Sequence, residues 1–140
     1  KKMPFLRIAP ICNGKIYVAP RSYQGEEPGK LDIPMEDYIY ACKTDTDKYA
    51  KEVENKYSNH ITGQPEPRFS LKHLVKETNG VKKTIMLYIL PLNDEEQIHF
   101  TGGKFVTPEE IEMNSAQYSS FLKEEIDHLN IVTQMWEEFK

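Results

Sequence analysis

The sequence predicts an α/β fold, in which strand hairpins and helices alternate along one chain. Three observations predict it: two pairs of β-rich runs that are each joined by Asn-Gly, a helical pattern between the two pairs, and a long amphipathic helix at the C-terminal end. The chain has 140 residues. That length suits a single domain, because folded domains most often have about 100 to 150 residues.

The first hairpin is predicted from two runs, Phe5–Cys12 and Lys15–Arg21, which flank Asn13-Gly14. Asn-Gly favours the positive φ angles of a type I′ turn. Glycine, proline and polar residues then predict a surface loop over residues 22–30. The run Leu-Asp-Ile-Pro at 31–34 predicts a short strand after this loop.

A helix is predicted to follow the short strand. Candidates for its N-cap lie in Thr44–Asp47, because Thr and Asp side chains accept hydrogen bonds from the first free N–H groups of a helix. Apolar residues then recur at helical spacing through about Ser58, namely Tyr49, Ala50, Val53 and Tyr57.

The second hairpin is predicted from Phe69–Thr78 and Val81–Leu92, which flank a second Asn-Gly at Asn79-Gly80. The middle of its return strand, residues 84–90, is nearly all apolar. An apolar run of this length predicts a strand that is buried on both faces.

The C-terminal third predicts one short strand and two helices. Gly102–Val106 predicts the strand, and Thr107–Glu110 begins a helix with a cap, a proline at the first position and a capping-box glutamate. From Ser115 onward a long amphipathic helix is predicted from its apolar residues, which are Tyr118, Phe121, Leu122, Ile126, Leu129, Val132, Met135, Trp136 and Phe139.

Composition excludes several functional classes. The net charge is −4 with three arginines, so no basic stripe exists for long nucleic acid. No apolar run approaches the roughly 20 residues of a membrane span. Cys12 and Cys42 lack metal-ligand spacing, which suits buried, inert thiols in a reducing, cytoplasmic compartment. The four dispersed histidines do not predict a metal site.

The order of these elements resembles the Nudix superfamily, whose members cleave nucleoside diphosphates linked to another group. Three segments carry the resemblance: Gly14–Arg21 is similar to the family's glycine, apolar strand and arginine, Leu31–Pro34 to its Trp-Asp-Leu-Pro, and Lys104–Glu110 to its Trp-Val-Ser-Pro-Glu-Glu. The resemblance spans about residues 5 to 139. It implies an α/β/α sandwich on a mixed β-sheet, completed by the long C-terminal helix.

The signature helix of that family reads Arg-Glu, an apolar residue, any residue, then Glu-Glu. Lys51–Lys56 takes its place here, and Glu52 is the one family glutamate that it keeps. Residues three and four apart share a helix face, so Glu52, Asn55 and Lys56 are predicted to point at the same spot. One carboxylate, one amide and one ammonium group suit Mg²⁺ poorly, because it prefers oxygen ligands and an ammonium repels it.

The resemblance therefore implies a domain that binds a nucleoside diphosphate-type ligand, with weak or absent metal-dependent hydrolysis. We expect Arg21, Lys51 and Lys56 to supply positive charge, with Lys56 contacting a ligand phosphate in place of Mg²⁺. Glu52 is the candidate catalytic carboxylate, or else it orients a lysine or contacts a ribose hydroxyl. Glu36 is a candidate ligand-binding residue. No metal ligand and no cofactor are predicted.

Two other functions stay open. An active hydrolase would use Glu52 and Mg²⁺ held by displaced carboxylates, for which the candidates are Glu36-Asp37, Asp45-Asp47 and Glu109-Glu110. A protein-interaction scaffold would use the C-terminal helix. With Trp136 and Phe139 this helix carries more apolar surface than is needed to cover one side of a small sheet. Packing on its own sheet and formation of a homodimer are the other uses of that helix.

Overall fold

The computed structural model describes residues 2–39, 46–78 and 80–140. Three residues named above, Cys42, Thr44 and Asp45, lie outside these ranges, as does Asn79. Within them the strands are β1 (Lys2–Cys12), β2 (Lys15–Pro20), β3 (Leu31–Asp32), β4 (Met35–Tyr38), β5 (Arg68–Thr78), β6 (Val81–Pro91) and β7 (Lys104–Val106). The helices are α1 (Thr46–Lys56), α2 (Pro108–Met113) and α3 (Ser120–Phe139), with short 3-10 turns η1 (Ser58–His60), η2 (Glu95–Gln97) and η3 (Ser115–Gln117).

All of these strands belong to one mixed sheet with β1 at its centre. The order along the sheet is β3-β2-β1-β6-β5. Strand β1 pairs in parallel with β6 along most of its length, and its other edge pairs antiparallel with β2 at one end and with β4 at the other. Strand β7 pairs antiparallel with β2. The parallel pair inside an otherwise antiparallel sheet confirms the mixed sheet that the resemblance implied.

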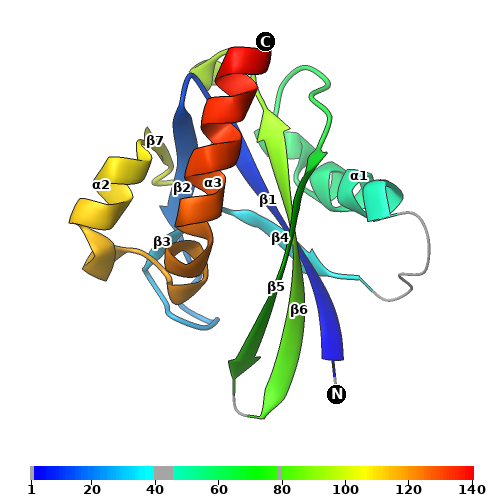
Figure 1. Cartoon of the computed structure of the whole chain (residues 1–140), viewed down its shortest axis with the longest axis vertical. Coiled ribbons are helices and arrows are strands. Elements are labelled where there is room, and N and C mark those ends of the chain that lie inside the picture. Colours follow the sequence, from blue (N-terminus) through cyan, green and yellow to red (C-terminus); the bar gives the residue numbers. More distant parts are fainter. Residues whose placement is uncertain (1, 40–45, 79) are drawn as a thin grey trace.

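Helices cover both faces of the sheet, as the α/β/α prediction required (Figure 1). Strand β6 shows how the two cores are built, because Met86, Tyr88 and Leu90 face α1 while Leu87 and Ile89 face α3. This alternation follows from the two-residue period of a strand. A strand with apolar residues on both faces must be covered on both, which is why α1 and α3 lie on opposite sides.

The predicted hairpins are both present. Asn13 and Gly14 adopt φ angles of 51° and 78°, as the type I′ turn requires, and they join β1 to β2. Gly80 has φ 76° and lies in the connection between β5 and β6. Helix α2 also begins where predicted, with Thr107 Oγ1 accepting a hydrogen bond from the Glu110 backbone N–H.

Several boundaries differ from the prediction, most of all the start of α3, and one strand was missed. The long helix begins at Ser120 rather than Ser115, because residues 115–117 form the turn η3 and the Ser119 hydroxyl caps the Leu122 N–H. Helix α1 ends at Lys56, ahead of the predicted Ser58. Strand β4 was not predicted, because its four residues are too few to show a clear pattern of buried and exposed side chains. Its pairing with β1 makes it a strand.

Candidate functional site

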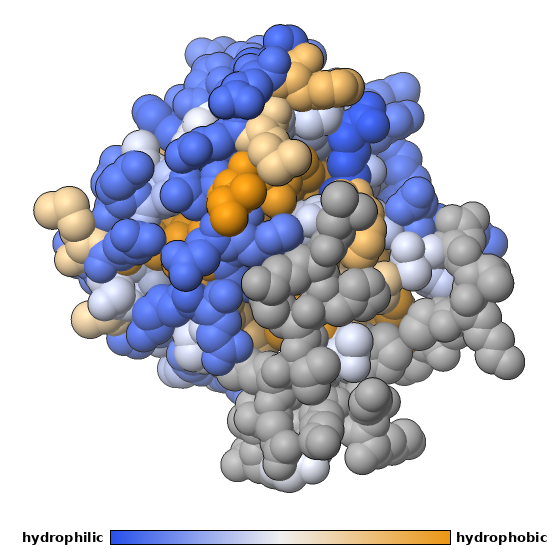
Figure 2. Space-filling view, in the orientation of Figure 1, coloured by the Kyte–Doolittle hydropathy of each residue, from blue (hydrophilic) through white to orange (hydrophobic). Residues whose placement is uncertain are grey.

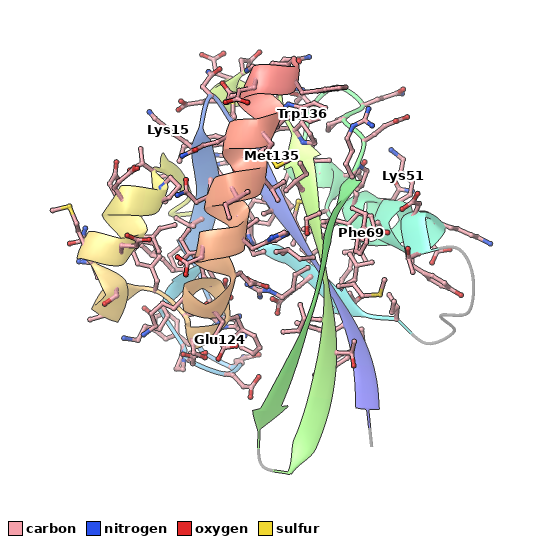
Figure 3. All side chains as sticks on the ribbon, viewed as in Figure 1. Lys15, Lys51, Phe69, Glu124, Met135 and Trp136 are labelled. Carbon is pink, nitrogen blue, oxygen red and sulfur yellow. The ribbon has the colours of Figure 1, made fainter. Side chains whose placement is uncertain are left out.

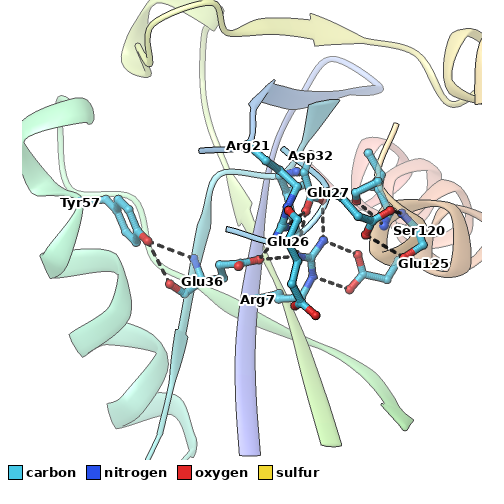
Figure 4. A network of polar contacts seen from close by, with 12 residues as sticks. Arg7, Arg21, Glu26, Glu27, Asp32, Glu36, Tyr57, Ser120 and Glu125 are labelled. Carbon is cyan, nitrogen blue, oxygen red and sulfur yellow. Dashed lines mark hydrogen bonds and ion pairs between the residues drawn. The ribbon is translucent and has the colours of Figure 1, made fainter. Parts of the chain in front are cut away.

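A cavity of about 490 Å³ opens where the end of β2, the segment from β3 to β4 and the end of α1 meet. Its polar side is supplied by Arg21, Ser22, Glu26, Asp32 and Glu36, and Figure 4 shows charged groups there from close by. Tyr57, His60 and Phe100 supply aromatic rings. The cavity therefore combines charged side chains with aromatic surface.

The loop from β2 to β3 is fixed by its own backbone. Arg21 N–H donates to the Lys30 carbonyl at 2.8 Å, and Gly29, at φ 78°, donates back to the Arg21 carbonyl at 3.1 Å. The Glu27 carboxylate accepts from the backbone and hydroxyl of Ser120, at 2.9 and 2.8 Å, in the first turn of α3. These bonds hold Arg21 against the cavity and tie the loop to α3.

Arg7 lies buried behind the cavity and joins four elements. Its guanidinium donates from Nε and Nη2 to the two oxygens of Glu125, each at 2.8 Å, and from Nη2 and Nη1 to Asp32 at 2.7 and 3.2 Å. Nη1 also donates to Glu36 Oε1. The side chains of Arg7, Asp32 and Glu125 are at most 1% exposed, so β1, β3, β4 and α3 meet at a charge cluster shielded from water.

The charge cluster holds three carboxylates and two guanidinium groups, because Arg21 Nη1 also donates to Asp32. Burial raises the pKa of Glu125 to about 7 even though Arg7 lowers it. Burial also raises the pKa of Glu36, against the same guanidinium. For Asp32 burial is outweighed by Arg7 and Arg21, so its pKa is lowered. Glu125 is therefore the carboxylate that holds a proton closest to neutral pH.

The aromatic side of the cavity is held by specific contacts. The Tyr57 hydroxyl donates to the Glu36 carbonyl at 2.9 Å, and the rings of His60 and Phe100 stack with centroids 3.9 Å apart and planes 6° apart. The Phe100 backbone N–H donates to the Tyr17 hydroxyl at 2.8 Å. A β-carbon on Gly103 would lie 1.9 Å from that hydroxyl, so only glycine leaves room for it.

The structure brings together two of the predicted site residues. Arg21 and Glu36 both line the cavity, and Arg21 Nη1 lies 3.8 Å from Glu36 Oε1. Arg21 is 14% exposed and Glu36 is 22% exposed, so both can reach a ligand.

Of the other predicted residues, one lies near the cavity and two lie elsewhere on α1. Lys56 Nζ is 3.0 Å from Asp37 Oδ2 and 5.6 Å from the centre of the Tyr57 ring, which places it at the rim. The hydrogen bond to Asp37 raises the pKa of Lys56. Lys51 pairs with Glu54 at 3.0 Å and lines a separate depression. Glu52 is exposed and is the partner of neither lysine.

Sequence reasoning missed the centre of the charge cluster. Arg7 interrupts an otherwise apolar run of β1, and Glu125 lies within the apolar stripe of α3. A charge in each apolar pattern was the available signal. Nothing in the sequence indicates that the two pair, because they are 118 positions apart.

Among the described residues, no group of three or more His, Cys, Asp and Glu side chains is placed to hold a metal ion. The nearest approach to such a group, Asp32, Glu36 and Glu125, surrounds the Arg7 guanidinium instead. The described helices include none that is long and apolar enough to cross a membrane. Cys12 is buried, as predicted, and burial raises the pKa of its thiol.

A second surface feature runs along the C-terminal half of α3. An apolar groove of about 470 Å³ lies between this helix and the start of β5. Figure 3 labels Met135 and Trp136 on α3 and Phe69 across from them, and Figure 2 shows apolar side chains gathered over this part of the helix. Ile131, Met135 and Phe139 are 59%, 61% and 80% exposed. The opposite face of α3 packs on the sheet, where Leu122, Ile126 and Leu129 join the core.

Comparison with known proteins identifies the class of fold. No family model and no curated protein matches the sequence. Many solved structures match the fold, however, and they identify it as the fold of the Nudix hydrolases.

Three of these structures show the extent of the likeness. A Nudix hydrolase from Nitrosomonas europaea is 12% identical over 94% of this chain and 90% of its own, with a TM-score of 0.66. The dihydroneopterin triphosphate pyrophosphohydrolase of E. coli is 15% identical over 91% and 94%, with a TM-score of 0.65. The C-terminal domain of mouse MUTYH, solved in complex with human PCNA, is 15% identical over 99% and 90%, with a TM-score of 0.60. At such identities the likeness establishes the fold alone.

Proposed function

We propose that this chain is a Nudix-fold domain that binds a nucleoside diphosphate-type ligand in the cavity between β2, β4 and the end of α1, with weak or absent metal-dependent hydrolysis. The observation that carries the proposal is the lining of this cavity. It combines Arg21 and Glu36 with the rings of Tyr57, His60 and Phe100. Hydrogen-bonding groups beside aromatic rings suit a planar heterocycle joined to a polar group.

Lys56 supports the part of the proposal that concerns phosphate. Its ammonium lies over the Tyr57 ring at the rim of the cavity, and its exposed ion pair with Asp37 is the kind that a ligand anion can replace at little cost. The hydrogen bond to Asp37 raises the pKa of Lys56 further above neutral, so its ammonium is charged at neutral pH. An ammonium at this position would take the part that a metal ion takes in binding phosphate.

Calorimetric titration tests the proposal directly. The protein is titrated with Mg²⁺ and Mn²⁺, and then with ADP-ribose in the presence and absence of metal. We expect ADP-ribose to bind with an affinity that the metals do not change, and without turnover. Binding that requires metal, or no binding at all, would contradict the proposal.

An active hydrolase is the second candidate. The neighbours from Nitrosomonas europaea and E. coli are described as hydrolases, and the exposed Glu52 carboxylate on α1 is open to solvent. Metal-dependent release of a nucleoside monophosphate in the same titration would favour this candidate. Glu52→Gln should then abolish turnover and leave ligand binding in place.

A protein-interaction scaffold is the third candidate, and the apolar groove along α3 favours it. The MUTYH domain of similar fold was solved bound to another protein. Deletion of α3 is an unsuitable test, because Leu122 and Leu129 of this helix are part of the core. Met135→Glu is a more specific test, with Met113→Glu as its control. Both methionines are exposed, and of the two only Met135 lines the groove. Light scattering after size exclusion should show a homodimer that only Met135→Glu disrupts.

A further inference from the structure

The charge of the cavity lining decides which end of a nucleotide fits inside. The charged residues that line it are Arg21, Glu26, Asp32 and Glu36. The single arginine among them is already engaged, because its Nη1 donates to Asp32 and its Nε donates to the Glu26 carbonyl. A phosphate in this cavity would therefore meet three carboxyl groups and one guanidinium that is already paired. Like charges at such close range oppose binding of the phosphate end.

Two polar atoms in the lining are suited to a neutral ligand. Glu36 uses Oε1 to accept from Arg7, and none of the described residues donates to its Oε2. Arg21 uses Nε and Nη1, and none of the described residues accepts from its Nη2. Since Arg21 Nη1 is 3.8 Å from Glu36 Oε1, the cavity presents a hydrogen-bond acceptor and a donor side by side.

The rest of the lining suits a flat ring. Tyr57 and Phe100 have ring centroids 5.8 Å apart, and His60 stacks on Phe100. The Tyr57 hydroxyl is bonded to the backbone of Glu36, which fixes the distance between the aromatic wall and the acceptor. Aromatic surface beside an adjacent donor and acceptor is complementary to a nucleobase edge, because purines carry an N–H next to a ring or carbonyl acceptor.

We propose that the cavity takes the nucleobase of the ligand, with Glu36 Oε2 accepting from a purine N–H and Arg21 Nη2 donating to the neighbouring purine acceptor. The ligand class is a purine nucleotide whose phosphates lie outward, toward Lys56. This inference rests on the proposed function, because it states how that ligand is oriented.

The orientation is tested on the unaltered protein with probes that separate base from phosphate. These probes are guanosine, adenosine, ADP, ribose 5-phosphate, and the two nucleosides methylated at N1. Methylation removes the N1–H of guanosine and blocks the N1 acceptor of adenosine. We expect at least one unmodified nucleoside to bind and its methylated form to bind about tenfold to hundredfold more weakly, since a hydrogen bond to a charged group is lost. Ribose 5-phosphate should not compete with the nucleoside.

Variants then assign the effect to Glu36. Glu36→Leu should lower nucleoside affinity and remove the preference over the methylated form, whereas Glu112→Leu, an exposed change on α2, should alter neither. Glu36→Leu keeps Asp32 and Glu125 as partners of Arg7 and keeps the pair between Arg21 and Asp32, so we expect the variant to fold. If the variant fails to fold, the comparison of methylated and unmodified nucleosides on the parent protein still shows whether the base enters the cavity.

The outcomes separate this inference from the proposed function. If ADP binds while methylation and Glu36→Leu have no effect and ribose 5-phosphate competes, the base does not enter the cavity and this inference is overturned. The proposed function would survive that result. If neither ADP nor any nucleoside binds, both are overturned.

Discussion

Lys56 is the residue on which the phosphate part of the function depends. Lys56→Glu would place a carboxylate next to Asp37 at the rim of the cavity, where an approaching phosphate meets it. We expect this variant to weaken ADP binding by about tenfold or more, because an attractive charge becomes a repulsive one. Isothermal calorimetry at low and at moderate salt measures the change, and the loss should be larger at low salt.

The matched control is Lys123→Glu, which makes the same charge change at an exposed position of α3. Equal effects of the two variants would show that only net charge matters. Unchanged ADP affinity in Lys56→Glu would remove Lys56 from the site.

Glu125 makes stability depend on pH in an unusual direction. Burial raises its pKa from 4.5 to about 7, so between these values the folded protein holds a proton that the unfolded chain has released. The free energy of unfolding should therefore fall as pH rises from about 4.5 to 7, by an amount on the order of 3 kcal/mol. Asp32 acts in the opposite sense and in a lower range: Arg7 and Arg21 lower its pKa, so the stability that its ionised form gives is lost as pH falls below about 4.

Urea unfolding at several pH values between 4.5 and 8 measures this slope. Glu125→Gln keeps the shape of the side chain and cannot ionise, so its slope should be smaller than that of the parent. The exposed change Glu112→Gln on α2 should leave the slope intact. A parent protein whose stability rises over this interval would show that Glu125 is ionised throughout.

What the sequence predicts about single residues depends on whether their partners are near in the chain. Helical spacing predicts that Glu52, Asn55 and Lys56 point at the same spot, and all three are exposed on α1. The partners of Lys56 and Arg7 were not predictable, since Asp37 is 19 positions away and Glu125 is 118. Pairings of this kind follow from the tertiary fold, which local patterns do not encode.

At the level of elements, the segment before β7 controls the aromatic wall. Gly103→Ala would place a carbon on the buried Tyr17 hydroxyl, which holds the Phe100 backbone. We expect a loss of about 1–3 kcal/mol in the free energy of unfolding, because Tyr17 must move within a packed core. Ligand affinity should fall as well, since Phe100 lines the cavity.

Chemical denaturation and calorimetry measure the two effects of Gly103→Ala. The stability control is Gly25→Ala, whose added carbon would meet only the Ser22 carbonyl at 3.9 Å. A Gly103→Ala protein as stable as the parent would show that Tyr17 shifts without cost.

Elements were predictable where local chemistry sets their ends. The Asn-Gly turns, the Thr107 cap and the continuous apolar run of β6 each act within a few residues, and these elements are present as predicted. The start of α3 was placed too early because the turn η3 continues the helical spacing until Ser119 caps the helix. Strand β4 depends on β1, which is distant in the sequence, and so no local pattern predicted it.

Considered as a whole, the molecule should unfold as one cooperative unit. Strand β1 supplies Leu6 and Ile8 to the core under α1, and Ala9 and Ile11 to the core under α3. Arg7 lies between them and joins three further elements. Loss of either core should therefore remove the support of the other. This expectation also tests whether residues 1–140 form one domain.

Two probes measured along one urea titration check this. Far-UV circular dichroism reports the whole backbone, and fluorescence of Trp136, the single tryptophan, reports the end of α3. The two transitions should coincide, as two-state unfolding requires. Separate midpoints would mean that the α3 side and the α1 side unfold independently.

The buried guanidinium of Arg7 also restricts how this protein can evolve. Replacing Arg7 alone leaves three carboxylates facing one guanidinium, and replacing Asp32 alone removes the carboxylate that pairs with both arginines, which is strongly destabilising, whereas replacing the whole set with apolar residues can be neutral. A protein that exchanged these residues one at a time would pass through less stable variants. We therefore expect related proteins either to keep the whole set or to lack all of it. Residues on the exposed face of α1 are not coupled to one another in this way. Glu52, Asn55 and Lys56 are exposed and can each change in one step, which lets the surface of α1 diverge while the core behind it stays the same.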